Sequence, residues 1–398
     1  MKDFSMSGAA KELKQRVIAA VDHAAPMWQE LSLRIHAHPE LGRNEVKASA
    51  WLAEAMEKSG FAVTRNYLDL PTSFLARKGK VGGKPVISYL AEMDALPSIG
   101  HACSHNLMGV AACLAGVGLG SVIGSEHGEV RVIGTPAEEN FSDKVRLIER
   151  GAFKDVDAAL MAHGGSKNYA KRDFIGRKAI SFEFRGTPAH ASAAPHEGVN
   201  ALDAMILFFT SVGLLRQQIR SESRIHGIIT HGGEAANTIP AYTRAEFNVR
   251  SFDAAYLDEL ERRVIACARG AAEATGTSLT AHGDPQPMLP AKRIPTLEQT
   301  YEDNLRFLGV PVDELAPNTG TGSTDFGNVS QVVPGVHAYF AMAPDHVHSH
   351  TPAFTVASAS PEGQVGMLIA AKTLALTGLD MVEDAALAAV IRGEFAKA

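Results

Sequence analysis

The run Pro85-Val86-Ile87-Ser88-Tyr89-Leu90-Ala91 predicts a strand that is apolar enough to be buried in a mixed sheet. It ends in the polar segment Glu92-Met93-Asp94-Ala95-Leu96-Pro97. After a loop comes a predicted helix, from about 106 to 120, that is rich in glycine and alanine. Small residues allow a helix to approach a sheet closely, so we expect this helix to pack directly on the strand.

Strands and helices alternate on both sides of this run, which predicts an α/β domain. Polar clusters follow several of the strands, at the exits where open α/β sheets place their functional sites. The other elements predicted in this part of the chain are strands at 61–64, 129–133 and 158–162 and helices at 8–25 and 44–59.

The pattern changes near residue 177. Residues 178–185, Lys-Ala-Ile-Ser-Phe-Glu-Phe-Arg, alternate between polar and apolar, which predicts a strand with one solvent-facing side. The elements predicted after it are a helix at 199–220, strands at 225–230 and 244–250, a helix at 254–275 and a strand at 278–282. The order β-α-β-β-α-β is that of a ferredoxin-like layer, so we predict an inserted domain at 177–290.

The α/β pattern resumes after residue 290, with a predicted helix at 297–308, a strand at 336–342 and a helix at 358–376. Residues 1–176 and 291–398 are therefore predicted to form one mixed-sheet α/β domain that the ferredoxin-like domain interrupts.

Composition excludes several classes of protein. The 398 residues are 45% hydrophobic and 21% charged, with a formal charge of −6 and no cluster of lysine and arginine, which argues against a nucleic-acid partner. The longest apolar runs are broken well short of a membrane span, and residues 1–5 lack the layout of a secretory signal. Three cysteines, Cys103, Cys113 and Cys267, are too few for a disulfide framework. We predict a cytoplasmic protein that does not contact membranes.

Four segments carry side chains able to bind a divalent transition metal, and each lies at a strand exit or in a loop. Thiolate, imidazole and carboxylate are the ligands that zinc and similar metals take in proteins. Each piece alone is a weak signal, and the strength lies in their order and placement. The segments are Cys103 with His105, Glu138-Glu139, His163, and His346-x-His348-x-His350.

The adjacent glutamates suggest a division of labour, because successive side chains diverge at the end of a strand. One carboxylate can bind metal, while the other takes a proton from a metal-activated water and passes it to a leaving nitrogen. We assign Glu138 to the acid–base role and Glu139 to the metal; the residues alone allow the reverse.

Seven segments, in one order along nearly the whole chain, resemble those of the aminoacylase/carboxypeptidase-G metallopeptidase family. The similarity is greatest to its amidohydrolase branch, which includes hippurate, indole-acetyl-amino-acid and aminobenzoyl-glutamate hydrolases. The segments are residues 92–97 (EMDALP), 100–106 (GHACSHN), 136–139 (PAEE), 186–191 (GTPAHA), 232–240 (GGEAANTIP), 248–250 (NVR) and 322–327 (GSTDFG).

The resemblance implies a catalytic domain with two divalent ions, manganese or zinc, and an inserted domain that dimerises and covers the site. It implies a small-molecule substrate and a homodimer or higher oligomer. The ligands that it implies are Cys103, His105, Glu139, His163 and one histidine of the C-terminal cluster, for which we favour His350 over His346 and His348.

The resemblance also implies roles for residues outside the ligand set. Glu138 matches the general base, and His190 matches a lid-domain histidine that reaches the partner's active site and steadies the tetrahedral oxyanion. Asn237 and Arg250 match lid positions that hold polar groups of the substrate, often a carboxylate. Asp325 is a candidate substrate contact or a loop cap.

Two residues beside the expected ligands depart from the family pattern. Ser104 stands where the branch usually has glycine, so this residue must tolerate a positive φ or the loop must differ. Asn106 stands where the family usually has aspartate. Asp94, in the segment before them, is expected to orient a group of the metal site.

The predicted function is hydrolysis of an amide C–N bond in a small N-acyl or aryl-amide amino acid or a dipeptide-like substrate. One alternative is a metal-dependent aminohydrolase that releases an amine from a non-peptide carbon, such as an aromatic ring. Another is a cysteine hydrolase that uses Cys103 with His190 or His105 as base, which leaves Glu138 and Glu139 without a role. The last is a binding module without catalysis.

Overall fold

The computed structural model describes residues 8–124, 128–315 and 321–398, which form two compact units. Unit 1 contains the described residues up to Arg172, those from Lys292 and those from Asn328 onwards. Unit 2 contains Asp173–Ala291 and Thr321–Gly327. Residues 1–5, which entered the prediction of location, lie outside the described part.

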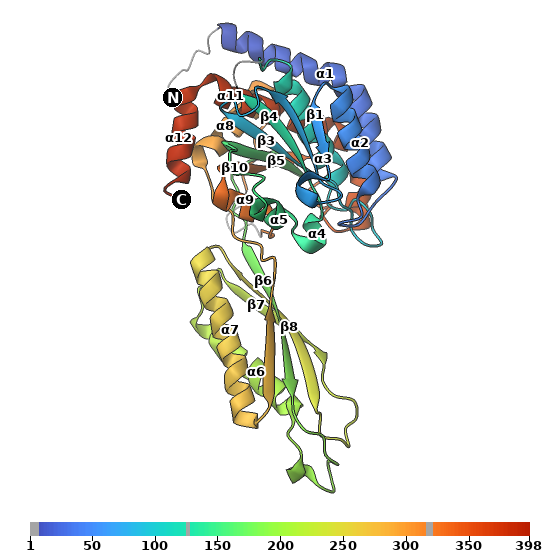
Figure 1. Ribbon diagram of the computed structural model, residues 1–398, viewed down its shortest axis with the longest axis vertical. Coiled ribbons are helices and arrows are strands. Elements are labelled where there is room, and N and C mark those ends of the chain that lie inside the picture. The colour runs from blue at the N-terminus through green and yellow to red at the C-terminus, as the bar shows by residue number, and fades with distance from the viewer. Residues whose placement is uncertain (1–7, 125–127, 316–320) are drawn as a thin grey trace. The chain divides into compact units, whose positions relative to one another are not determined.

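Unit 1 is built on a six-stranded mixed sheet, as the sequence predicted, with the strand order β1-β2-β4-β3-β5-β10 (Figure 1). The central strands β4, β3, β5 and β10 run parallel, whereas β1 and β2 are antiparallel. Every residue of β3 is buried, which explains its apolar sequence. The strands are β1 (Ala62–Arg65), β2 (Phe74–Gly79), β3 (Val86–Glu92), β4 (Glu129–Thr135), β5 (Ala158–Gly165) and β10 (Gly335–Ala341); β2 was not predicted.

Helix α3 (His105–Gly120) packs on the central strands, and its glycines mark the closest approaches. A β-carbon at Gly109 would lie 2.5 Å from the backbone oxygen of Glu92, and one at Gly116 would lie 2.5 Å from the side chain of Val132. Only glycine fits at these positions, so the predicted close contact between this helix and the sheet is confirmed.

Helices α1 (Gly8–His36) and α11 (Pro361–Glu383) lie against α3. The predicted end of α1 at residue 25 is wrong, because the helix continues through Pro26 and buries Trp28, Leu31 and Ile35. The remaining helices of the described chain outside unit 2's core are α2 (Val46–Lys58), η1 (Tyr67–Asp69), α4 (Glu138–Phe141), α5 (Lys144–Glu149), α8 (Pro295–Phe307), α9 (Phe326–Val332), α10 (Pro352–Ala357) and α12 (Ala385–Phe395).

Helix α11 is long and apolar enough to cross a membrane by length and composition alone. Its window of highest hydropathy is 67% buried inside the protein, against α3, α8 and strands of the sheet. This burial identifies α11 as a core helix of unit 1 rather than evidence for a membrane span.

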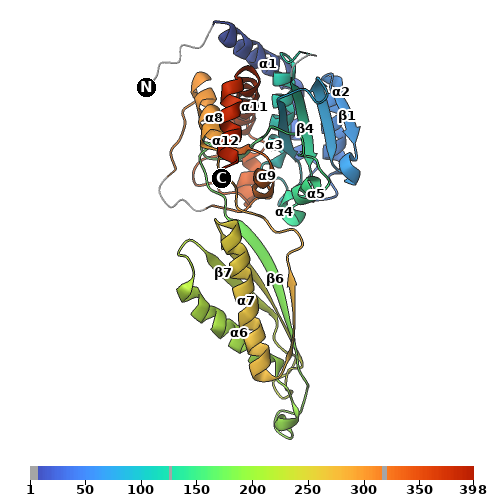
Figure 2. The same cartoon turned by 60° about the vertical axis from the view of Figure 1, so that its left-hand side comes forward.

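Unit 2 has the predicted order β-α-β-β-α-β, and its strands pair antiparallel in the order β7-β8-β6-β9. Helices α6 and α7 cover one face of this sheet, where Phe182, Phe208 and Phe247 form the centre of the core (Figures 1 and 2). The elements are β6 (Gly176–Arg185), η2 (Pro195–Glu197), α6 (Ala201–Leu215), η3 (Arg216–Gln218), β7 (Arg224–His231), β8 (Tyr242–Ser251), α7 (Ala254–Thr275) and β9 (Ser278–Gly283). The ferredoxin-like layer is therefore confirmed.

Candidate metal centre

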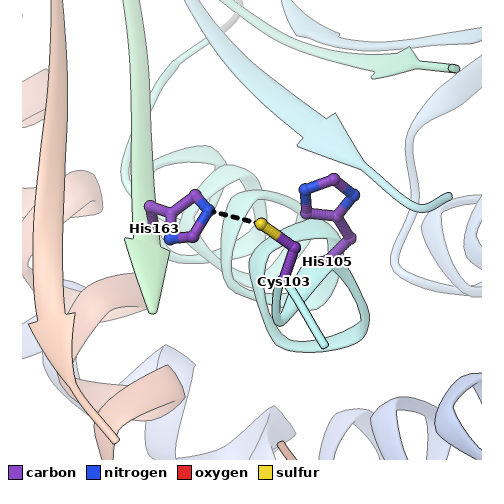
Figure 3. Close-up of side chains that lie close together, drawn as sticks. All are labelled: Cys103, His105 and His163. Carbon is purple, nitrogen blue, oxygen red and sulfur yellow. Dashed lines mark hydrogen bonds between the residues drawn. The ribbon is translucent and has the colours of Figure 1, made fainter. Parts of the chain in front are cut away.

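The predicted ligands of unit 1 come together where the parallel strands end. Cys103 and His105 stand at the start of α3, Glu139 lies in the first turn of α4 after β4, His163 lies in β5, and His350 follows β10. Figure 3 shows Cys103, His105 and His163 with their side chains gathered at the end of α3. Parallel strands that end at one edge of a sheet bring distant segments together in this way.

The distances between donor atoms are those of a compact cluster. Cys103 Sγ lies 3.2 Å from His163 Nε2. Glu139 Oε1 lies 3.6 Å from His350 Nε2 and 3.9 Å from His105 Nε2. Within each of the groups Cys103–His105–His163 and Cys103–Glu139–His350, all donor atoms lie within 4.8 Å of one another. Cys103 belongs to both groups, so the five predicted ligands form one continuous set.

Hydrogen bonds orient two of the histidines. His105 Nδ1 lies 2.9 Å from the backbone oxygen of Asp94 and 3.0 Å from its Oδ1, and His163 Nδ1 lies 2.7 Å from the backbone oxygen of Gly164. A carbonyl oxygen only accepts, so each Nδ1 carries the hydrogen and each Nε2 presents its lone pair to the cluster. The expected orienting role of Asp94 agrees with these contacts.

The residues present fit a divalent metal ion. Glu139 Oε1 is buried without a hydrogen-bond partner among the described residues, although carboxylate oxygens are rarely left so. Burial and the charge of Glu139 raise the pKa of the Cys103 thiol, which a cation beside the sulfur would oppose. The mixture of sulfur, imidazole and carboxylate donors suits zinc or manganese.

Glu138 is nine-tenths buried and begins α4, directly after Ala137, which has a left-handed backbone with φ of 58°. Two carboxylates fix this turn: Glu45 accepts a hydrogen bond of 2.7 Å from Ala137 N, and Asp94 Oδ2 accepts one of 3.0 Å from Glu139 N. Burial and the neighbouring Asp94 raise the pKa of Glu45 to about 7. Sequence reasoning missed Glu45, whose partner lies 92 residues further along the chain.

A second missed group is the buried ion pair between Lys144 Nζ and Glu92 Oε1, at 2.5 Å. The side chain of Lys144 is 0% exposed and that of Glu92 is 1% exposed. Glu92 Oε2 also lies 3.3 Å from His105 Nε2, the atom that faces the cluster. One signal was present in the sequence, since Glu92 is a charged residue directly after a wholly apolar strand.

The two departures from the family pattern have different outcomes. Ser104 has φ of 62°, so it adopts the left-handed conformation that glycine would adopt without strain. Its hydroxyl donates to Cys103 O and accepts from Gly164 N. Asn106 Nδ2 donates to Ser358 O at 2.9 Å, which occupies its side chain with the backbone of the core.

Replacing Ser104 with alanine is expected to lower the free energy of unfolding of unit 1 by about 1–3 kcal/mol, because the buried Gly164 N–H loses its acceptor. Ser104→Gly loses the same bonds but relaxes the left-handed backbone, so its loss should be smaller by about 1 kcal/mol. Denaturation followed by tryptophan fluorescence measures this, because both tryptophans, Trp28 and Trp51, lie in unit 1. Equal losses in the two variants would contradict the role of the strained φ.

The C-terminal histidines are distinguished by the geometry. His350 donates its backbone N–H to Ala102 O at 2.8 Å, and its Nε2 reaches Glu139. His346 and His348 are exposed, and neither belongs to a candidate metal group of the described residues. This arrangement agrees with the preference for His350.

The predicted residues of unit 2 are described by themselves. His190 is exposed, and its Nδ1 accepts from the backbone N–H groups of Ser192 and Ala193, both at 3.3 Å. Asn237 is exposed in the same region, and its backbone oxygen accepts from Ala191 N. Arg250, in β8, donates to Ser323 Oγ at 2.8 Å.

Asp325 is fully buried in the segment 321–327, where Thr324 Oγ1 accepts from the backbone N–H of Phe326. A hollow of about 400 Å³ beside the loop that carries Asn237 is lined by Asn200, Thr238 and Pro240 among others.

Known proteins resemble this chain over nearly its whole length. Residues 175–275 match the model of the M20 peptidase dimerisation domain. The Xaa-Arg dipeptidase of Mus musculus is 37% identical over 398 aligned positions, which cover 96% of this chain and 92% of the relative. A p-aminobenzoyl-glutamate hydrolase of Escherichia coli is 28% identical, with 95% of this chain and 93% of the relative covered.

Solved structures agree on the fold. A putative aminohydrolase from methicillin-resistant Staphylococcus aureus superposes with a TM-score of 0.79 at 21% identity, covering 93% of this chain and all of that one. A dinuclear metal-binding peptidase of the M20 family from Bacillus subtilis superposes with a TM-score of 0.69 at 19% identity, covering 94% and 99%. The chain therefore belongs to the M20 peptidase family and is a metal-dependent hydrolase of amide C–N bonds.

Proposed function

We propose that unit 1 is the catalytic unit and that Cys103, His105, Glu139, His163 and His350 hold two divalent ions, manganese or zinc. The observation that carries this proposal is the convergence of the five donors around the buried, unpartnered Glu139 Oε1. Every other carboxylate in contact with these donors already has a partner in the chain, Lys144 for Glu92 and the backbone of Glu139 for Asp94.

When bound, the metals would polarise the substrate carbonyl and lower the pKa of water. Glu138 then acts as general base, taking the proton of the attacking water, and as general acid, returning it to the leaving nitrogen. Because the left-handed Ala137 precedes α4, Glu138 and Glu139 leave the turn in different directions, so that one carboxylate can bind metal while the other meets substrate.

We propose that the substrate is a small N-acyl or aryl-amide amino acid or a dipeptide. The relatives named Xaa-Arg dipeptidase, p-aminobenzoyl-glutamate hydrolase and N-acetyl-L-cysteine deacetylase all have names that place an amino acid at the amide. Burial and Glu139 raise the pKa of Cys103, the opposite of what a cysteine nucleophile needs, so the cysteine-hydrolase alternative is disfavoured. No contact among the described residues favours release of an amine from an aromatic carbon.

Unit 2, residues 177–290 in the sequence prediction, is proposed to be the lid and dimerisation domain. Since His190 Nδ1 accepts two backbone N–H groups, its Nε2 carries the hydrogen and can donate to an oxyanion. Asn237, Arg250 and Asp325 are proposed to bind polar groups of the substrate. All three cysteines are free thiols, which agrees with the proposed cytoplasmic location.

A substrate screen with defined metals tests the proposed function. Protein stripped with a chelator should be inactive on dipeptides and N-acyl amino acids, and Mn²⁺ or Zn²⁺ should restore turnover. Aryl amides and aromatic amines belong in the same screen. Full activity in protein shown by elemental analysis to be metal-free would overturn the metal assignment, and turnover of aromatic amines alone would favour the aminohydrolase alternative.

We also propose that two copies associate through unit 2. Strand β7 is an edge strand whose backbone is open to a further strand, and it exposes Ile228 and Ile229. Helix α6, beside it in the core, exposes Ile206 and Leu214. An edge strand with an apolar rim is the kind of surface that pairs with a second copy.

Replacing Ile206 with lysine is expected to raise the dissociation constant of the dimer at least about tenfold, because each copy brings one unpaired charge into an apolar contact. Sedimentation over a range of concentrations measures this constant. Val390→Lys is the matched control, since Val390 is a similarly exposed apolar residue of α12 in unit 1. Weakening by Val390→Lys alone would place the contact elsewhere.

A further inference from the structure

Three arginines stand in one row across the open face of the unit 2 sheet. In the antiparallel ladders, Arg250 of β8 is directly opposite Arg177 of β6 on one side and Arg224 of β7 on the other. Directly opposite residues of antiparallel strands point to the same face. The adjacent positions Val249 and Ile225 are buried against the helices, so the three arginines lie on the face that the helices leave open.

Like charges directly opposite one another destabilise a sheet, so this row needs an explanation. The carboxylate nearest to Arg177 in the described chain is that of Asp284, with 3.6 Å from Nη2 to Oδ2, and Arg177 Nε is buried without a hydrogen-bond partner. The side-chain contact of Arg250 is with the neutral hydroxyl of Ser323. Burial and the charge of Arg177 lower the pKa of Arg250.

Arg224 differs from the other two. It is exposed, and its Nη1 donates to the backbone oxygens of Ser221 and Ser223, which bind the guanidinium to its own turn. Arg177 and Arg250 therefore remain as two half-buried, neighbouring guanidinium groups with little compensating negative charge.

We propose that Arg177 and Arg250 together form a clamp for the free carboxylate of the substrate, with Arg177 as an additional specificity-determining residue. This inference rests on the proposed function. A guanidinium offers a planar fork of N–H donors that matches a carboxylate, and two such groups side by side can share its two oxygens. A carboxylate would also neutralise the unfavourable charge pair, so acids are preferred over the corresponding amides.

The ligand class follows from this geometry. One carboxylate satisfies the pair, because Arg224 is held by its turn and Asp284 already lies beside Arg177. Substrates are then amides with an amino acid whose carboxylate is free, and blocking that carboxylate should remove most of the recognition.

Binding to a Glu138→Gln protein tests the clamp without turnover, with Ala-Arg and its C-terminal amide as probes in titration calorimetry. The acid should bind about 10- to 100-fold more tightly than the amide, as expected for charged hydrogen bonds. Adding Arg177→Met should reduce this ratio about tenfold or more, while adding Arg224→Met should leave it unchanged. A ratio that survives Arg177→Met, or that is near one from the start, overturns the clamp.

Two further measurements separate this inference from its rivals. If Arg177 served only as the partner of Asp284, then Asp284→Asn would reduce the ratio as much as Arg177→Met; we expect it to keep the preference for the acid. Hydrolysis of both probes by the protein with Glu138 intact is measured in parallel. Equal turnover of acid and amide would overturn the clamp and leave the proposed function standing, whereas acid-selective binding without turnover would do the reverse.

Discussion

Replacing Glu138 with glutamine is expected to lower kcat by about 10²- to 10⁴-fold while the metal content of the protein stays the same. Glutamine keeps the size of the side chain but cannot accept the proton of the attacking water. The metal should remain, because the five proposed ligands do not include Glu138. Steady-state kinetics together with elemental analysis of the purified variant check both halves of this expectation.

Glu139→Gln is the informative comparison, because it changes the same group one position further along. Its Oε1 lies within 4 Å of both His350 and His105, so its loss should reduce bound metal as well as activity. Glu149→Gln, at the exposed end of α5, is the neutral control. If Glu138→Gln lost metal and Glu139→Gln kept it, the two glutamates would have to exchange roles, which is the assignment that the sequence left open.

Much of the metal centre could be predicted because its parts are local. The apolar pattern of β3 and the alternating pattern of β6 identify their strands without knowledge of the rest of the chain. A cysteine, a histidine or a glutamate pair at a strand exit is similarly a property of a short segment. Parallel strands then bring the exits together, so a correct α/β prediction carries the candidate ligands with it.

The supporting groups could not be predicted, because their roles depend on partners far along the chain. Glu45 acts through Ala137, and Asn106 acts through Ser358, 252 residues away. Pro26 shows the same limit in the fold: proline usually ends a helix, but the core offered by α3 and α11 lets α1 continue. In each case tertiary packing decides what the local sequence leaves undetermined.

The buried pair of Lys144 and Glu92 is the largest such case for stability. Replacing Lys144 with methionine is expected to lower the free energy of unfolding of unit 1 by about 3–5 kcal/mol, since it leaves the charge of Glu92 buried without a partner. Both side chains are almost fully buried, and Lys144 Nζ lies 2.5 Å from Glu92 Oε1. Tryptophan fluorescence follows the unfolding of unit 1, because Trp28 and Trp51 both belong to it.

The double variant Lys144→Met/Glu92→Gln separates the pair from simple loss of packing. Removing both charges leaves no unpaired ion, so the double variant should be more stable than Lys144→Met alone. Lys171→Met is the matched control, since Lys171 also binds a buried carboxylate, that of Glu302, but is itself 45% exposed; its loss should be at most about 1 kcal/mol. A double variant no more stable than Lys144→Met would mean that the ammonium group acts through contacts other than Glu92. Because Glu92 also lies 3.3 Å from His105 Nε2, the metal affinity of these variants shows whether the pair supports the ligand cluster as well as the core.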